Sequence, residues 1–125
     1  MQIPANLKYT KEHEWISVED EIATVGITDY AQGELGDLVF VELPETGSTV
    51  TQMEAFGTIE AVKAVSDLFA PVSGEVVEVN EQLNDTPEIV NKDPYGEGWM
   101  IKIKLDNPDE LEELLDSESY KKLIS

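Results

Sequence analysis

The hydrophobic and polar positions of the chain follow short runs of apolar and alternating character that are typical of β-strands. Residues 15–18 and 22–27 form two such runs, and the acidic residues between them predict a tight hairpin. Runs of the same character predict further strands at 38–43, 49–52, 55–62, 68–71, 75–80 and 99–105. The pattern therefore predicts a mainly β fold.

One short helix is predicted within this β pattern, near residues 28–35. Thr28 offers an N-cap side chain at its start, and Gly36 stands where a helix commonly ends. The helix is expected to interrupt the succession of strands early in the chain.

The C-terminal part of the chain predicts helices instead of strands. Asn107 offers a cap, Pro108 suits the first helical position, and acidic residues follow in the first turn. Ser117 is predicted to cap a second short helix, so the helical segment lies near 108–124. Its leucine stripe is expected to pack as a lid on the sheets.

A weak internal repeat suggests how the strands are arranged. Residues 36–41 and 74–79 share a glycine, an acid and an apolar strand. A second valine-bearing segment follows each of them, at 49–50 and at 89–90. We expect one domain over 1–125, a sandwich of two sheets with approximate two-fold symmetry, in which the hairpin near 57–74 joins the halves.

Lys63 is the candidate functional residue of that hairpin. It is the only Lys or Arg between Lys11 and Lys92, and apolar residues flank it on both sides. A primary amine at a turn is well placed for the covalent attachment of a prosthetic group. The competing interpretation is a solubilising lysine at a hairpin tip.

Composition narrows the classes of function. With 8 lysines, no arginine and 27 acidic residues, the net charge of −19 argues against binding nucleic acid or an anionic membrane. It favours encounters with proteins that carry basic surfaces.

The chain has no cysteine and one histidine, His13, so thiol chemistry and metal sites built on cysteines or several histidines are excluded. We interpret His13, which stands between two acids, as a surface residue.

The N-terminal segment has neither a basic start nor an apolar core, so we predict no signal peptide. No apolar run approaches the length that spans a membrane. The initial Met1 favours the bacterial cytoplasm over the alternative, a mature protein of the mitochondrial matrix.

Six segments together resemble the lipoyl-carrying H-protein family of the glycine cleavage system. They occur in the family's order and cover almost the whole chain. They are YTKEHEW (9–15), VGITDYA (25–31), LGDLVFVELP (35–44), IEAVKA (59–64), PVSGEV (71–76) and NKDPYGEGWMIKIK (91–104).

The resemblance implies a barrel-sandwich hybrid of the lipoyl/biotinyl type with lipoate joined to Lys63 as an amide. Biotin-carrying relatives usually place their lysine between methionines, so the neighbours Val62 and Ala64 favour lipoate. The implied role is that of a shuttle and not of an enzyme. It would carry an aminomethyl group from glycine decarboxylase to aminomethyltransferase and electrons to dihydrolipoamide dehydrogenase. A lipoate-attaching enzyme is a fourth expected partner, and the carrier is expected to be a monomer.

By position in the family motifs, Glu14 and Asp67 are candidates for docking the loaded arm. An aminomethyl group on the arm is lost to water unless it is sheltered, and a carboxylate in a cleft would pair with its ammonium. With 27 acids in the chain, each of the two also fits an ordinary surface residue.

Three alternatives remain open at this stage. The chain could be a lipoyl relay donor for 2-oxoacid dehydrogenase complexes, which would have the same fold and the same Lys63. It could be an acidic β binding module whose lysine is unmodified. An enzyme with paired carboxylates is disfavoured, because so acidic a chain brings acids together by chance.

Overall fold

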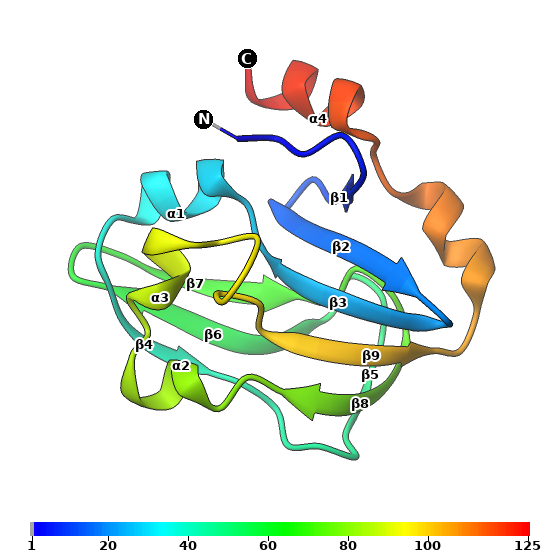
Figure 1. Cartoon of the computed structure of the whole chain (residues 1–125), viewed down its shortest axis with the longest axis horizontal. Helices are drawn as coiled ribbons and strands as arrows, with labels where there is room; N and C mark the ends of the chain where they lie inside the picture. Colours follow the sequence, from blue (N-terminus) through cyan, green and yellow to red (C-terminus); the bar gives the residue numbers. More distant parts are fainter. Residues whose placement is uncertain (1) are drawn as a thin grey trace.

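The computed structural model describes residues 2–125 as two antiparallel β-sheets with short helices around them (Figure 1). The six-stranded sheet has the order β1-β2-β3-β9-β8-β5 and the three-stranded sheet the order β4-β6-β7. The strands are β1 (Lys8–Tyr9), β2 (Glu14–Glu19), β3 (Ile22–Ile27), β4 (Leu38–Glu42), β5 (Thr49–Val50), β6 (Ala55–Ala61), β7 (Val65–Phe69), β8 (Gly74–Val79) and β9 (Ile101–Leu105). The helices are α1 (Asp29–Leu35), α2 (Gln82–Asp85), α3 (Ile89–Lys92), the 3₁₀ helix η1 (Pro108–Glu113) and α4 (Ser117–Ile124).

The main core lies between the inner faces of the two sheets. Alternate residues of each strand point inward because successive side chains of a strand face opposite sides. The large sheet contributes Val25, Ile101 and Ile103, among others, and the small sheet contributes Val41 and Ile59. Each of these aliphatic side chains stabilises the fold by about 1.5–3 kcal/mol through burial.

The predicted division into two halves is confirmed at the level of the sheets. The part of the chain before Lys63 supplies strands to both sheets, and so does the part after it. The repeat is wrong in its second segment, because 49–50 forms strand β5 whereas 89–90 lies in helix α3. The two parts of the chain are therefore alike in supplying strands to both sheets, and they differ in the short connecting segments.

Further differences from the predicted elements have local causes. Strand β1 was not predicted, since two residues are too few to show an alternating pattern. Strand β9 begins at Ile101 and not at the predicted residue 99. Strand β7 begins at Val65 and not at the predicted residue 68. The prediction missed its first three residues because all three are exposed and two of them, Ser66 and Asp67, are polar. Helices α2 and α3 were not predicted, since four residues are too few to show a helical period.

The predicted caps of α1 are both present. The Thr28 hydroxyl oxygen accepts a hydrogen bond from the N–H of Ala31 at 3.1 Å. At the other end Gly36 has a φ of 84° and donates its N–H to the carbonyl of Gln32. A left-handed residue with no side chain ends the helix at low cost.

The C-terminal segment is helical as predicted, but one cap differs. Asn107 accepts from the N–H of Asp109, and the first helix is of the 3₁₀ type. The second helix, α4, is capped by Asp116, which accepts from the N–H of Ser119 at 2.8 Å, whereas Ser117 is buried. A carboxylate is as good a cap as a hydroxyl, so the shift is one residue in position only.

The leucine stripe packs on the main core through Leu111 and Leu114, as predicted. Helix α4 instead packs beside the N-terminal segment (Figure 1). Tyr9 and Leu115 exchange two backbone hydrogen bonds of 2.8 Å. The rings of Tyr9 and Tyr120 stack with centroids 4.7 Å apart, and Leu7 and Trp15 complete this second apolar cluster. Across residues 2–125, no helix combines the length and the apolar character needed to cross a membrane.

Candidate functional site: the Lys63 hairpin and the adjoining cleft

Strands β6 and β7 form the hairpin that presents Lys63. The N–H of Ala61 donates to the carbonyl of Ala64 at 2.7 Å and closes the turn. The N–H of Val62 donates to the carbonyl of Asp37 at 3.1 Å, which anchors the turn to the segment after α1. Lys63 is exposed, and in the described part of the chain no carboxylate forms an ion pair with it. The turn therefore holds an available amine on a fixed base.

The side chain of Lys63 lies over the C-terminal end of α1. A Cβ atom built on Gly36 would be 3.2 Å from Cε of Lys63 and 3.8 Å from its Nζ. The absence of a side chain at Gly36 thus leaves room for the lysine to lie there. Leu35, the last residue of α1 and the neighbour of Gly36, lines a cleft, so the lysine lies next to a helix end that borders this cleft.

This cleft has a volume of about 300 Å³ and lies between α1, the start of β2 and strand β7. Its floor is apolar, since Ile27, Ile59 and Leu68 contribute to it, and its rim is acidic. The other lining residues are Glu12, His13, Glu14, Tyr30, Ala31, Glu34, Leu35, Ser66 and Asp67. The volume is at the lower end of the range for small-molecule sites, so it suits the end of an arm.

Glu14 lies inside the cleft wall and is only 1% exposed. One carboxyl oxygen accepts from the hydroxyl of Thr10 at 2.5 Å, and the other accepts from the N–H of Phe69 at 3.3 Å. Burial away from water raises the pKa of Glu14 to about 8 despite these hydrogen bonds. Glu14 is therefore not an ordinary surface acid, and at neutral pH its carboxyl group is mostly protonated.

Asp67 is exposed and lines the same cleft from β7. It is paired in register with Thr58 of β6, close to the point where β7 passes the start of β2. Glu12 and Glu34 add two further carboxyl groups to the lining, and no lysine lines the cleft. The structure thus brings together Glu14 and Asp67, 53 residues apart in sequence, in a setting that favours a cation.

His13 is a cleft residue and not the surface residue that we predicted. It is half-buried, it has a left-handed φ of 71°, and its ring lies 5.0 Å from that of Tyr30. Its Nδ1 is 2.9 Å from the hydroxyl of Tyr120. Burial lowers the pKa of His13, and the nearby Glu12 and Glu34 oppose that effect. Nothing in the run Glu12–Glu14 indicates this contact, because its partner comes from the C-terminal helix.

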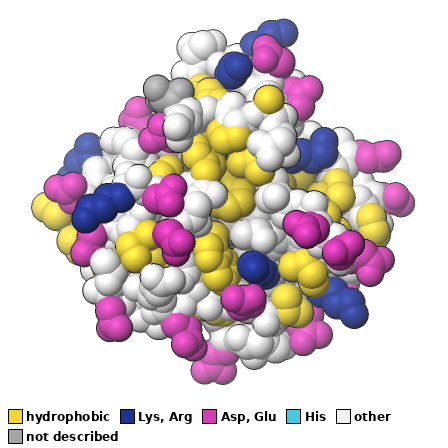
Figure 2. Space-filling model, in the orientation of Figure 1, with side chains coloured by type: hydrophobic (Ala, Val, Ile, Leu, Met, Phe, Trp, Pro, Cys, Tyr) yellow, Lys and Arg dark blue, Asp and Glu magenta, His cyan; other side chains and the backbone are white. Residues whose placement is uncertain are grey.

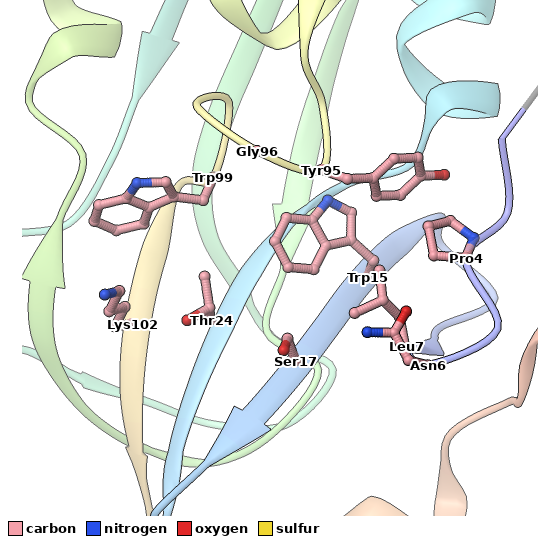
Figure 3. Close-up of a pocket in the computed structure, with 10 residues that line it drawn as sticks. All are labelled: Pro4, Asn6, Leu7, Trp15, Ser17, Thr24, Tyr95, Gly96, Trp99 and Lys102. Carbon is pink, nitrogen blue, oxygen red and sulfur yellow. The ribbon is translucent and has the colours of Figure 1, made fainter.

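A second hollow of about 360 Å³ lies on the outer face of the large sheet. Figure 3 shows the rings of Trp15, Tyr95 and Trp99 around it. The indole N–H of Trp15 donates to the carbonyl of Pro94 at 2.9 Å, and the amine of Lys102 lies 5.1 Å from the centre of the Trp99 ring. None of the predicted site residues lines this hollow, and these polar groups have partners within the fold.

Comparison with known proteins agrees with the resemblance in the sequence. The family model described as "Glycine cleavage H-protein" matches residues 7–125. The glycine cleavage system H protein of Bacteroides thetaiotaomicron is 59% identical over 125 residues, which cover 100% of this chain and 99% of that protein. The H protein of Staphylococcus carnosus is 56% identical over 124 residues, covering 99% and 98%.

A solved structure supports the same relationship in three dimensions. The crystal structure of a glycine cleavage system H protein from Mycobacterium marinum superposes with a TM-score of 0.90 at 44% identity. The match covers 96% of this chain and 97% of that one. Sequence and fold therefore agree over nearly the full length, and the chain belongs to the glycine cleavage H-protein family.

Proposed function

We propose that this chain is the lipoyl-bearing shuttle of a glycine cleavage system, with lipoate joined by an amide bond to Nζ of Lys63. The observation that carries the proposal is the position of Lys63, an exposed and unpaired amine on an anchored turn, next to a helix end that borders an acid-rimmed cleft. A lysine that only improved solubility would need neither the anchor at Asp37 nor the cleft.

Bound lipoate would supply a dithiolane that takes up and gives up electrons and a one-carbon amine unit. The residues of the chain would present, orient and shelter it, and the chemistry would belong to the partner enzymes. On this proposal the chain has no turnover of its own. Glycine decarboxylase, aminomethyltransferase and dihydrolipoamide dehydrogenase would act on the arm in turn, and a lipoate-attaching enzyme would act on Lys63.

The cleft fits the cationic end of a loaded arm. Its apolar floor suits a hydrocarbon chain, and Glu14 and Asp67 lie where an ammonium group would meet carboxyl groups. Entry of a cation would lower the pKa of Glu14, so the side chain would release its proton as the pair forms. Within a buried site such a charge-assisted hydrogen bond is stronger than one in water.

Charge supports the expected kind of partner. Acidic side chains are spread over the face drawn in Figure 2, and lysines are few. The net charge of −19 favours fast encounters with partners whose docking surfaces are basic.

We propose that the carrier acts as one domain and as a monomer, because each enzyme must reach the same arm. The bacterial relatives support a bacterial cytoplasm as its location.

Intact-mass measurement with peptide mapping tests the proposal. The protein is produced with lipoate and a lipoate-attaching enzyme, and a single lipoyl increment is expected on the peptide that contains Lys63. Lys63→Arg, which keeps the charge, should carry no increment, and Lys104→Arg, a matched change at another exposed lysine, should be fully modified. An increment on a different lysine, or none in the wild type, would overturn the proposal.

A further inference from the structure

The hydroxyl group of Tyr120 contacts one residue that lines the cleft, His13, and the residue that caps the helix beside it, Thr28. Tyr120 belongs to α4 and is fully buried, with 0% exposure. Its oxygen lies 2.7 Å from Oγ1 of Thr28 and 2.9 Å from Nδ1 of His13. One buried atom of the C-terminal helix thus contacts the residue that precedes α1 and the residue that precedes β2.

Both contacts support residues that line the cleft. Thr28 is the N-cap of α1, the helix that supplies Tyr30 and Ala31 to the lining. His13 lines the cleft itself, and its carbonyl accepts from the N–H of Thr28 at 3.1 Å. A shift of the Tyr120 hydroxyl would therefore move the start of α1 and the His13 ring together.

Packing alone accounts for the ring of Tyr120 but not for its hydroxyl. The ring stacks on Tyr9 at 4.7 Å with an angle of 10° between the planes, which a phenylalanine would do equally well. A buried hydroxyl needs hydrogen-bond partners; one partner of this hydroxyl lines the cleft, and the other caps the helix that forms one side of it. The hydroxyl of Tyr9 has a different partner, the carbonyl of Pro4 at 2.6 Å, which does not line the cleft.

The three groups form a chain of hydrogen bonds whose direction depends on the His13 proton. Oγ1 of Thr28 already accepts from the N–H of Ala31. If Nδ1 of His13 is unprotonated, Tyr120 donates to it and Thr28 donates to Tyr120; if Nδ1 carries a proton, both bonds reverse. Only the first arrangement gives the Thr28 hydroxyl hydrogen an acceptor among the hydrogen bonds of residues 2–125. The chain therefore favours the His13 tautomer with an unprotonated Nδ1 and holds the ring in one orientation.

We propose that Tyr120 is a positioning residue for the cleft, whose hydroxyl fixes His13 and the Thr28 cap so that a loaded arm is held and sheltered. The part that concerns the arm rests on the proposed function. The C-terminal helix then acts on the carrier site through this hydroxyl, in addition to the edge-on contact of the Tyr120 and His13 rings, whose centroids are 5.8 Å apart. Helix α4 itself contributes no residue to the cleft lining.

The test compares Tyr120→Phe with Tyr9→Phe. Both variants keep the stacked rings and lose one buried hydroxyl, but only the first loses contacts to cleft residues. The lipoylated full chain is loaded with glycine by the decarboxylase, and the rate at which the one-carbon unit is lost to water is measured. Tyr120→Phe should shorten the lifetime about fivefold, as expected for one lost hydrogen bond, and Tyr9→Phe should leave it within about twofold of the wild type.

A second readout needs no lipoate. Because His13 is the only histidine, its ring ¹⁵N and ¹³C signals are resolved without assignment. The unmodified wild type and Tyr9→Phe should show ring ¹⁵N shifts of one tautomer, and Tyr120→Phe should show averaged shifts.

Unchanged His13 signals in Tyr120→Phe would overturn the positioning role even if arm docking itself fails. If the His13 signals change in Tyr120→Phe but the one-carbon unit has the same lifetime on Tyr120→Phe and Tyr9→Phe, the proposed effect of Tyr120 on the arm would be overturned. If the wild-type arm decays as fast as free aminomethyl-lipoamide, arm docking under the proposed function fails, and the His13 signals alone decide the positioning role. Equal melting temperatures of the two variants would confirm that stability does not explain a difference.

Discussion

Lys63 and Gly36 are in contact although they belong to different structural elements: a Cβ on Gly36 would lie 3.2 Å from Cε of the lysine. The contact places the amine at the end of α1, the helix that forms one side of the cleft. A substitution of Gly36 would therefore have two separate effects: it would strain the backbone, whose φ is 84°, and it would contact the side chain of Lys63.

Replacement of Gly36 by alanine should destabilise the fold without preventing attachment. At the φ of 84° and ψ of −157° of this position an alanine costs about 1–3 kcal/mol, whereas the flexible end of Lys63 can move away from the new methyl group. Urea unfolding should show this loss, and intact mass should still show modification. Gly33→Ala is the matched control, because nothing lies within 4 Å of its Cβ position inside α1. That change should stabilise the protein by up to about 1 kcal/mol, and equal effects at both sites would contradict this explanation.

Moving the lysine by one residue should abolish attachment. In one variant Val62→Lys is combined with Lys63→Ala, and in the other Ala64→Lys is combined with the same change. A step of one residue turns the side chain toward another direction, while exposure at the turn keeps the fold intact. Intact mass measures attachment and circular dichroism measures folding. Efficient modification of either variant would show that the enzyme does not depend on the geometry of the turn.

The apolar residues around Lys63 should matter to the attaching enzyme more than to the other partners. Val62 and Val65 are 77% and 66% exposed and lie beside the amine, which that enzyme must reach. Val65→Thr should raise KM for attachment several-fold, and the modified variant should accept the one-carbon unit normally. Val77→Thr, a similar change on an exposed valine of β8, serves as the control. An equal effect of the two changes would speak against recognition by the hairpin.

Glu14 should make the stability of the unmodified protein depend on pH. A carboxyl group whose pKa is raised by folding favours the folded state below its ordinary pKa, and this advantage is lost as pH rises. For Glu14 the loss should extend from about pH 4.5 to about pH 8, and linkage makes it several kcal/mol. Urea unfolding at a series of pH values measures it. Glu14→Gln, which stays neutral, should lack this slope, and parallel curves for the two proteins would contradict the raised pKa.

The two candidate acids should protect the loaded arm. Glu14→Gln or Asp67→Asn should shorten the lifetime of the one-carbon unit on the arm about tenfold, the effect of one charge-assisted hydrogen bond. The measurement is expressed relative to the same adduct on free lipoamide, which removes the intrinsic effect of pH. Asp85→Asn, a change at an exposed acid of α2, is the control.

The same protection should depend on pH in a defined direction. Docking needs the ionised form of Glu14, whose pKa is raised by burial to about 8, so protection should increase as pH rises toward that value. The increase should disappear in Glu14→Gln and remain in Asp67→Asn. A lifetime that is the same in all variants would exclude these acids as the docking groups.

The sequence was sufficient for features that depend on neighbouring residues. The caps at Thr28 and Gly36 and the strands on both sides of the hairpin follow from local patterns, and all are present. The isolated position of Lys63 among apolar residues also identified the turn that presents it. These signals are local because a cap or a turn is formed by residues only a few positions apart.

The environment of the site could not be predicted in the same way. Glu14 and His13 occur in a charged run that is typical of a surface, yet one is buried and the other half-buried. Their burial results from β7, α1 and Tyr120, which approach from distant parts of the chain. The choice of Asp116 over Ser117 as the cap of α4 was equally undetermined, since both residue types cap well.

The distance in sequence between His13 and Tyr120, 107 residues, has a consequence for the order of folding. Contacts between distant residues form late, because the entropy of closing a long loop must be overcome first, while hairpins of adjacent strands form early. The hairpin that carries Lys63 can therefore exist before the cleft beside it is complete. During refolding, the amine should become recognisable to a modifying enzyme at a stage when the protein cannot yet shelter what is attached to it.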